Sequence, residues 1–133
     1  MKHFEVVAAV IFEGPEVLCV QRRPGPYAYT ALHYEFPGGK IEAHESPETA
    51  LKREIKEELA LEITVQRPLL IVEHTYPDFA ITLHSYVCQS QSRQLQLHEH
   101  IDAQWLAPRD LRGLRWAAAD VPIVERLMAE HAR

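Results

Sequence analysis

The segment "FPGGKIEAHESPETALKREIKEELAL", residues 36–61, joins two adjacent glycines to a strongly charged helical pattern. Ser46 is a good N-cap residue and Pro47 suits the first helical position, so we expect a helix to begin there. At 100° per residue, one buried apolar stripe forms from Leu51, Ile55 and Leu59. A neighbouring face collects Glu54, Glu57 and Glu58. Because like charges at this spacing cost roughly a few tenths of a kcal/mol each, the pattern predicts a compensating partner.

A charged helix face alone is usually just solvated, but this one belongs to a longer fixed spacing. Gly39 is followed after five residues by Glu45, and after seven more by Arg53-Glu54-Ile55 and then Glu57-Glu58. This spacing resembles the box of the Nudix hydrolase family, G-x5-E-x7-R-E-U-x-E-E-x-G-U, in which U is apolar. The match is complete except at Ala60, where the family has glycine. Alanine adopts the left-handed conformation expected there at a cost of roughly 1 kcal/mol, so the departure concerns folding rather than chemistry.

The resemblance to the MutT-type subgroup extends over nearly the whole chain, from the stretch Glu35-Phe36-Pro37-Gly38-Gly39 to the late Glu99. It implies an α/β fold, the Nudix α/β/α sandwich with a central mixed β-sheet, as one domain over residues 1–133. The residue pattern predicts matching elements. We expect strands within residues 5–12, 17–22, 34–36, 61–77, 79–89 and 102–106, a helical turn over 108–114 and an amphipathic helix over 120–133.

Composition limits the function classes. At 133 residues and 47% hydrophobic, the chain suits one compact domain, and no apolar run is long enough for a membrane span. We expect a soluble, cytoplasmic protein. A net charge of −5 argues against a nucleic acid polymer as partner, whereas a small anion carried by a metal stays open. Cys19 and Cys88 lie in separate strand-like runs, which favours reduced core thiols over a redox or zinc motif. The oligomeric state is not determined by the sequence.

A carboxylate patch without histidine or cysteine offers the hard oxygen ligands that suit Mg²⁺, with Mn²⁺ as the alternative. The family resemblance assigns metal binding to Glu54, Glu57, Glu58, Glu99 and the Gly38 carbonyl. It also implies that one glutamate takes a proton from the attacking water. Glu54 is the first choice and Glu99 the alternative, because the base varies within the family. Arg53 is expected to fix the glutamates through a bidentate contact.

Further residues are candidates for substrate binding. The resemblance implies nucleotide contacts for Arg23, Glu35, Phe36, Pro37, Gly38, Trp116 and Asp120. Three alternatives stay open: Arg23 as a solvent-facing strand end, Asp120 as a plain helix N-cap, and Trp116 as a core or lid aromatic. "HEH" at residues 98–100 raises a weaker alternative, a transition-metal site, because on an extended segment both histidines face one way.

The resemblance implies metal-dependent hydrolysis of nucleoside triphosphates to a nucleoside monophosphate and pyrophosphate, through substitution at the β-phosphorus. It suggests nucleotide-pool sanitation in support of DNA repair, with 8-oxo-dGTP as substrate. Cytosine nucleotides are the first alternative, because "EHIDAQWL" and "AAADVPIVERL" also resemble pyrimidine-preferring CTP pyrophosphohydrolases. An ionised Asp120 can accept a hydrogen bond from an amino group of the nucleobase, and a protonated Asp120 can also donate one. Nucleoside-diphosphate-linked substrates remain open. A non-catalytic nucleotide sensor is disfavoured by the intact charged box.

Overall fold

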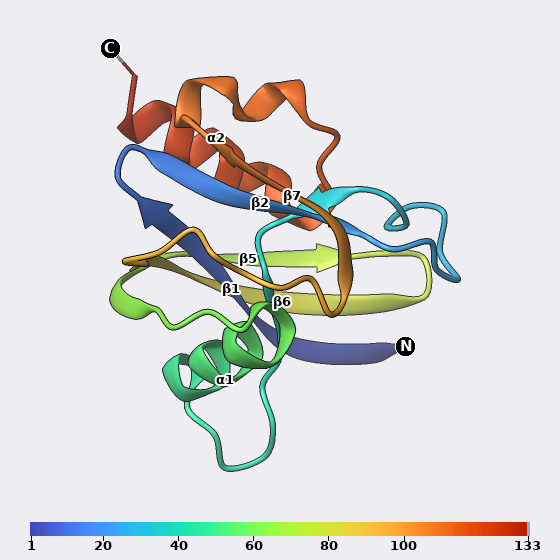
Figure 1. Ribbon diagram of the computed structural model, residues 1–133. Coiled ribbons are helices and arrows are strands. Elements are labelled where there is room, and N and C mark those ends of the chain that lie inside the picture. Colours follow the sequence, from blue (N-terminus) through green and yellow to red (C-terminus); the bar gives the residue numbers. More distant parts are fainter. Residues whose placement is uncertain (133) are drawn as a thin grey trace.

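A mixed β-sheet forms the centre of the protein, whose computed structural model describes residues 1–132 (Figure 1). Its strands are β1 (Lys2–Glu13), β2 (Glu16–Arg22), β3 (Tyr34–Glu35), β4 (Gly38–Lys40), β5 (Thr64–Thr75), β6 (Phe79–Gln89) and β7 (His100–Leu106). Their order is β3-β2-β1-β6-β5, while β4 also pairs with β1 and β7 with β2. Because β1 runs parallel to β6 and antiparallel to β2 and β4, the sheet is mixed as predicted.

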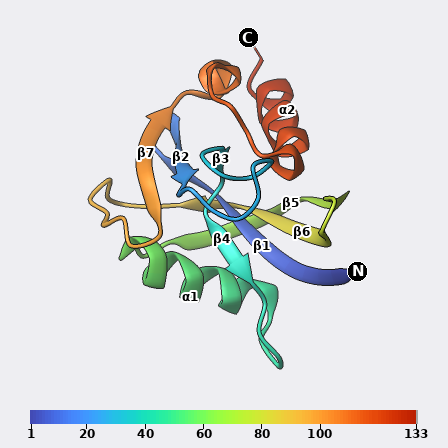
Figure 2. The ribbon, with the colours of Figure 1, turned by 90° about the vertical axis from the view of Figure 1, so that its right-hand side faces the viewer.

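Two helices cover opposite faces of this sheet, α1 (Pro47–Leu59) and α2 (Val121–Glu130) (Figure 2). Short 3₁₀ helices, η1 (Pro108–Gly113) and η2 (Ala118–Asp120), lead into α2. The predicted α/β/α sandwich is therefore confirmed. Within residues 1–132, no helix has the length and apolar character that a membrane crossing requires.

Alternation along β1 separates two hydrophobic cores. Val7, Ala9 and Ile11 pack with the apolar stripe of α1. The intervening residues of β1, Ala8 and Val10, pack with the apolar side of α2. The two cysteines lie one in each core, Cys19 on the α2 side and Cys88 on the α1 side. Both are free, as predicted, and burial raises the pKa of each thiol to about 12.

The boundaries of α1 follow from its local chemistry. The Ser46 hydroxyl accepts a hydrogen bond from the Thr49 N–H at 3.2 Å, and Pro47 opens the helix. Its apolar stripe is fully buried, as predicted. At the other end, Ala60 takes the left-handed conformation, with φ 53° and ψ 38°, and its N–H donates to the Lys56 carbonyl. The alanine thus occupies the strained conformation in which the family has glycine.

Several boundaries differ from the sequence predictions. Strand β4 was not predicted, because two adjacent glycines carry no strand propensity; pairing with β1 creates it. Strand β5 begins at Thr64 rather than at residue 61, and α2 begins at Val121 and ends at Glu130. The predicted helix end at residue 133 falls outside the described residues. The other predicted strands and the turn of residues 108–114 are confirmed to within a few residues.

Candidate functional site

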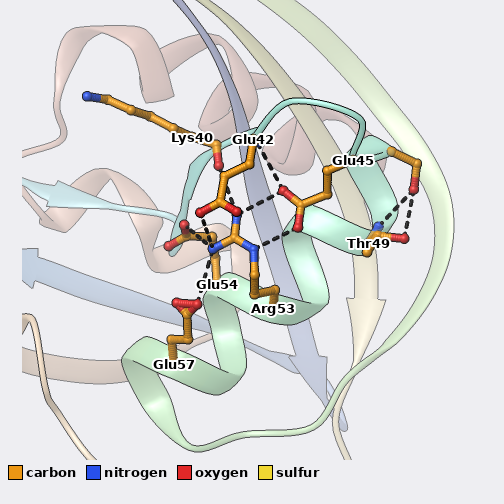
Figure 3. A network of polar contacts seen from close by, with 8 residues as sticks. Lys40, Glu42, Glu45, Thr49, Arg53, Glu54 and Glu57 are labelled. Atoms are coloured by element: carbon orange, nitrogen blue, oxygen red, sulfur yellow. Dashed lines mark hydrogen bonds and ion pairs between the residues drawn. The ribbon is translucent and has the colours of Figure 1, made fainter.

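Arg53 lies at the centre of a network of carboxylates between α1 and the loop that follows β4 (Figure 3). Its Nε and Nη2 donate to the two oxygens of Glu45 at 2.7 and 2.9 Å, so the bidentate contact is made with this residue. Its Nη1 donates to Glu54 at 2.9 Å and to Glu57 at 3.2 Å. Nη2 also reaches the Lys40 carbonyl at 3.1 Å. One guanidinium therefore ties the end of β4 and the following loop to the glutamate face of α1.

The two glycines before this loop allow close backbone contacts. A Cβ at Gly38 would lie 1.8 Å from the Val7 carbonyl oxygen, so only glycine permits this pairing of β4 with β1. A Cβ at Gly39 would lie 2.4 Å from the Glu54 carboxylate. The Glu54 carboxylate thus lies directly against the Gly39 backbone.

A cavity of about 660 Å³ lies next to these glycines and extends from Glu58 of α1 to Asp120 at the start of α2. This volume suits a small-molecule ligand. The cavity brings together residues that the sequence analysis assigned to metal or substrate: Arg23, Glu35, Phe36, Gly38, Glu58, Glu99 and Asp120. Gly39 also lines it, so Glu54 lies just behind the wall.

Glu58 lies partly buried among other acidic side chains, so its charged form is disfavoured. Its Oε1 is buried and has no hydrogen-bond partner. Burial raises the pKa of Glu58 above its ordinary value, and the charges of Glu54, Glu35 and Glu99 raise it further. A buried acceptor among carboxylates is costly unless a cation or donor approaches it.

This donor chemistry fits a divalent metal ion. Carboxylate oxygens are the preferred ligands of Mg²⁺ and Mn²⁺, and the unpartnered Glu58 oxygen offers a place for a cation. Within residues 1–132, no three His, Cys, Asp or Glu side chains already converge as a metal site. Glu54 and Glu57 point to Arg53 instead (Figure 3). The ligand set is therefore chemically suitable, and its side chains are partly held by the guanidinium.

Asp120 forms the buried wall of the cavity. The residue is only 6% exposed, and its Oδ1 accepts a hydrogen bond from the Phe36 N–H at 3.0 Å. Burial raises the pKa of this carboxyl well above its ordinary value, and the charge of Glu35 adds to the effect. Asp120 occupies the N-cap position of α2, as the helix-cap alternative expects, but its side chain makes no capping hydrogen bond to the helix. The carboxyl is directed instead to the Phe36 N–H.

Among residues 1–132, Trp116 and Pro37 are not part of the cavity lining but lie behind it. The Trp116 ring stacks on Phe36 with centroids 4.6 Å apart, and its Nε1–H donates to the Leu111 carbonyl at 2.7 Å. This geometry matches the core-aromatic alternative, with Trp116 supporting Phe36. Pro37 is buried, and its carbonyl accepts from the Ala9 N–H at 2.8 Å.

The two histidines of "HEH" do not act as a pair. His98 is exposed, and its backbone N–H donates to the Glu58 carbonyl at 3.1 Å. His100 is buried, and its Nε2 lies 2.9 Å from Oε2 of Glu35. The expected common orientation was wrong because β7 begins only at His100, so strand alternation does not include His98.

Sequence reasoning missed the aromatic wall of the cavity. Tyr27 and Tyr29, from the loop after β2, stack on each other, and Tyr29 also stacks on Tyr76, each pair with centroids 5.2 Å apart. Phe79 packs against all three, and the Tyr29 hydroxyl donates to Asp78. The only sequence signal was the aromatic content around the turn at residues 76–79, which does not show where the loop folds.

Comparisons with known proteins agree with this geometry. The CTP pyrophosphohydrolase of Escherichia coli K12 is 37% identical over 132 residues, covering 99% of this chain and 96% of the relative. An 8-oxo-dGTP diphosphatase of Proteus vulgaris is 34% identical over 94 residues, covering 71% and 83%. The solution structure of the E. coli ORF135 protein has a TM-score of 0.82 at 36% identity, covering 99% of this chain and 93% of that one.

The family comparison covers nearly the whole described chain. The NUDIX domain model matches residues 2–127, which include the glutamate face of α1, the cavity and most of α2. Members of this family generally need a divalent metal ion, in agreement with the carboxylate chemistry of the site. The chain belongs to the Nudix hydrolase family.

Proposed function

We propose that this Nudix hydrolase converts nucleoside triphosphates to a nucleoside monophosphate and pyrophosphate. One observation carries the proposal: the same cavity is lined by acidic Glu58 and Glu99, by basic Arg22 and Arg23, and by the buried carboxyl of Asp120. Carboxylates suit a divalent ion, arginines suit phosphates, and a buried polar group suits a base edge. The relatives named above act, by their names, on CTP and on 8-oxo-dGTP.

We assign the metal ion to the carboxylates of Glu54, Glu57, Glu58 and Glu99 and to the Gly38 carbonyl. Mg²⁺ is the proposed ion and Mn²⁺ the alternative. When bound, such an ion screens the charge of the phosphates and makes water more acidic. The unpartnered, buried Oε1 of Glu58 supports this assignment.

The protein's own groups then position the reactants and move the proton. Arg53 holds Oε1 of Glu54 at 2.9 Å, so we assign the proton of the attacking water to Oε2 of Glu54. The water oxygen bonds to the β-phosphorus while the bond from that phosphorus to the oxygen bridging it to the α-phosphorus breaks. The monophosphate leaves with that oxygen, and pyrophosphate keeps the water oxygen. Glu99 is the second candidate base, because its side chain lines the cavity.

Two nucleobases, cytosine and 8-oxoguanine, are candidates for the end of the cavity that Asp120 lines. The cytosine alternative is favoured by the 37% identity to a CTP pyrophosphohydrolase along almost the whole chain. The raised pKa of Asp120 supports 8-oxo-dGTP, because a protonated carboxyl both donates and accepts, as an oxidised guanine edge requires. We therefore propose activity on both, in support of nucleotide-pool sanitation in the cytoplasm.

Isotope labelling in the products tests the reaction. The protein is incubated with Mg²⁺ in ¹⁸O-water with CTP, dCTP, dGTP and 8-oxo-dGTP, and with a nucleoside diphosphate sugar for comparison. We expect equal amounts of monophosphate and pyrophosphate from the triphosphates, with ¹⁸O only in pyrophosphate. Label in the monophosphate would contradict β-phosphorus attack. Binding without any product would support the nucleotide-sensor alternative, and cleavage of the sugar conjugate alone would show a diphosphate-linked substrate.

A further inference from the structure

The Glu35 carboxylate is held from two sides by residues of neighbouring strands. Arg22, at the end of β2, donates through Nη1 to Oε1 at 3.1 Å. The Nε2 of His100, at the start of β7, lies 2.9 Å from Oε2. Arg22 and His100 are register partners, and β3, which carries Glu35, pairs with the same β2 strand. All three residues line the cavity, so this array is part of its wall.

Packing alone does not explain a histidine at residue 100. Its side chain is 4% exposed, and its Nδ1 is buried without a hydrogen-bond partner. An apolar side chain would fill this place without leaving a desolvated nitrogen. Because carboxylate oxygens only accept, the Nε2 of His100 carries the hydrogen that it donates to Glu35. The contact with Glu35 therefore gives the imidazole a specific role.

The position of Glu35 affects the base end of the cavity through the next residue. The Phe36 N–H donates to Asp120, so a shift of Glu35 moves the donor that holds the buried carboxyl. Each oxygen of Glu35 receives one hydrogen bond from the array and can accept another. The free acceptor capacity suits an amino group of the base or a hydroxyl group of the sugar.

We infer that His100 is a positioning residue of the nucleotide site, which fixes the Glu35 carboxylate so that it accepts a hydrogen bond from the nucleoside. The inference rests on the proposed function, in which Glu35 binds the substrate. It assigns His100 no contact with the reacting phosphorus. Its loss should therefore weaken nucleotide binding, with turnover of bound substrate largely retained.

Two substitutions separate the contact with Glu35 from the bulk of the ring. In His100→Gln, the side-chain amide can place an N–H near the position of Nε2, whereas in His100→Asn the shorter amide cannot reach it. We expect His100→Asn to raise KM at least about tenfold with kcat within about threefold, because a hydrogen bond to a charged group is lost. His100→Gln should stay within about threefold of the wild type in both KM and kcat.

A double-mutant cycle tests whether the effect passes through Glu35. The variants are His100→Asn, Glu35→Ala and the combination, each checked by circular dichroism and thermal unfolding. We expect His100→Asn to add less than about twofold to KM once Glu35 is alanine, because the two residues act as one unit. If His100→Asn raised KM as much in the Glu35→Ala protein as in the wild type, the inference would be overturned. A tenfold loss in folded His100→Gln would overturn it too.

Binding measurements distinguish this inference from the proposed function. An α,β-methylene triphosphate of cytidine, which lacks the cleavable oxygen bridge, is titrated into the same variants by calorimetry. Wild-type protein that binds it but releases no pyrophosphate from any triphosphate would refute the proposed reaction. The positioning role of His100 would still be supported if His100→Asn weakened binding of the analogue tenfold and His100→Gln did not. Equal affinities across the wild type, Asn and Gln would refute the role of His100 whether or not hydrolysis occurs.

Discussion

The Arg53 guanidinium donates two hydrogen bonds to the Glu45 carboxylate, from Nε to Oε2 at 2.7 Å and from Nη2 to Oε1 at 2.9 Å. Glu45 precedes α1, and Arg53 lies in its middle. The pair therefore fixes the loop after β4 against the helix. The same guanidinium holds Glu54, so a residue with no proposed contact to the substrate helps to order the catalytic carboxylates.

This pair makes stability depend on pH. Hydrogen bonds from Arg53, followed by the Glu42 backbone N–H, lower the pKa of Glu45 from 4.5 to about 2. A lowered folded-state pKa stabilises the fold above the unfolded value, and this contribution is lost as the pH falls from about 4.5 through about 2. We predict that the difference in unfolding free energy between the wild type and Glu45→Gln is largest above about pH 5, shrinks as the pH falls, and disappears only below about pH 2.

Urea unfolding at a series of pH values measures this difference. Glu62→Gln, at an exposed glutamate beyond α1, is the matched control and should show no such trend. A difference that stays constant from pH 7 to pH 2 would show that the charge of Glu45 contributes nothing through Arg53.

Gly39 is predicted to be essential for activity. Its added Cβ would lie 2.4 Å from Glu54, so Gly39→Ala forces the carboxylate away. Misplacing a catalytic group by about 1 Å costs roughly a hundredfold, and we expect turnover to fall at least that much. Gly113→Ala, where a Cβ meets nothing within 4 Å, is the control and should keep wild-type rates. Normal turnover in a folded Gly39→Ala variant would argue against a catalytic Glu54.

Ala60 carries removable strain. Its left-handed backbone, φ 53°, suits glycine better than alanine, so Ala60→Gly should stabilise the protein by about 0.5–1 kcal/mol. The matched control, Ala129→Gly at the exposed penultimate residue of α2, should not stabilise the protein, because glycine there loses helix propensity without relieving a left-handed backbone. Denaturant midpoints measure both changes, and turnover per folded molecule should not change. Destabilisation by Ala60→Gly would contradict this account of the helix end.

Asp120 is predicted to select the base. Asp120→Asn keeps the acceptor for the Phe36 N–H, but its amide is never charged and always offers a donor. We expect the kcat/KM ratio of 8-oxo-dGTP to dCTP to change by roughly tenfold or more. The comparison includes dGTP and 5-methyl-dCTP in the wild type and the variant. If every ratio stayed the same, the carboxyl would have only a structural role.

The sequence predicted α1 accurately because its signals are local. The Ser46 cap, Pro47 and the 3.6-residue stripe each specify the helix without reference to the rest of the chain. The left-handed helix end expected for Ala60 followed from the family pattern and was confirmed. Strand β4 could not be predicted, because β1 rather than its own side chains determines it.

The candidate site could be predicted only in part. The glutamate face follows from helical spacing, but the partners of those glutamates depend on tertiary structure. The bidentate contact of Arg53 is with Glu45 across the loop, and Trp116 supports Phe36 from behind the wall. The burial of His100 against Glu35 joins two strands that are distant in sequence. Such contacts have no local sequence signal.

Magnesium-dependent pyrophosphate release by Glu57→Gln and Glu58→Gln tests the central claim most directly. Each substitution keeps the size of the side chain and removes one charge from the patch that we assign to the metal. We predict that both variants keep the wild-type circular dichroism and thermal midpoint while kcat falls by at least about a hundredfold, and that Glu62→Gln stays normal. Near-wild-type rates in both folded variants would contradict the assignment of the metal ion to this patch.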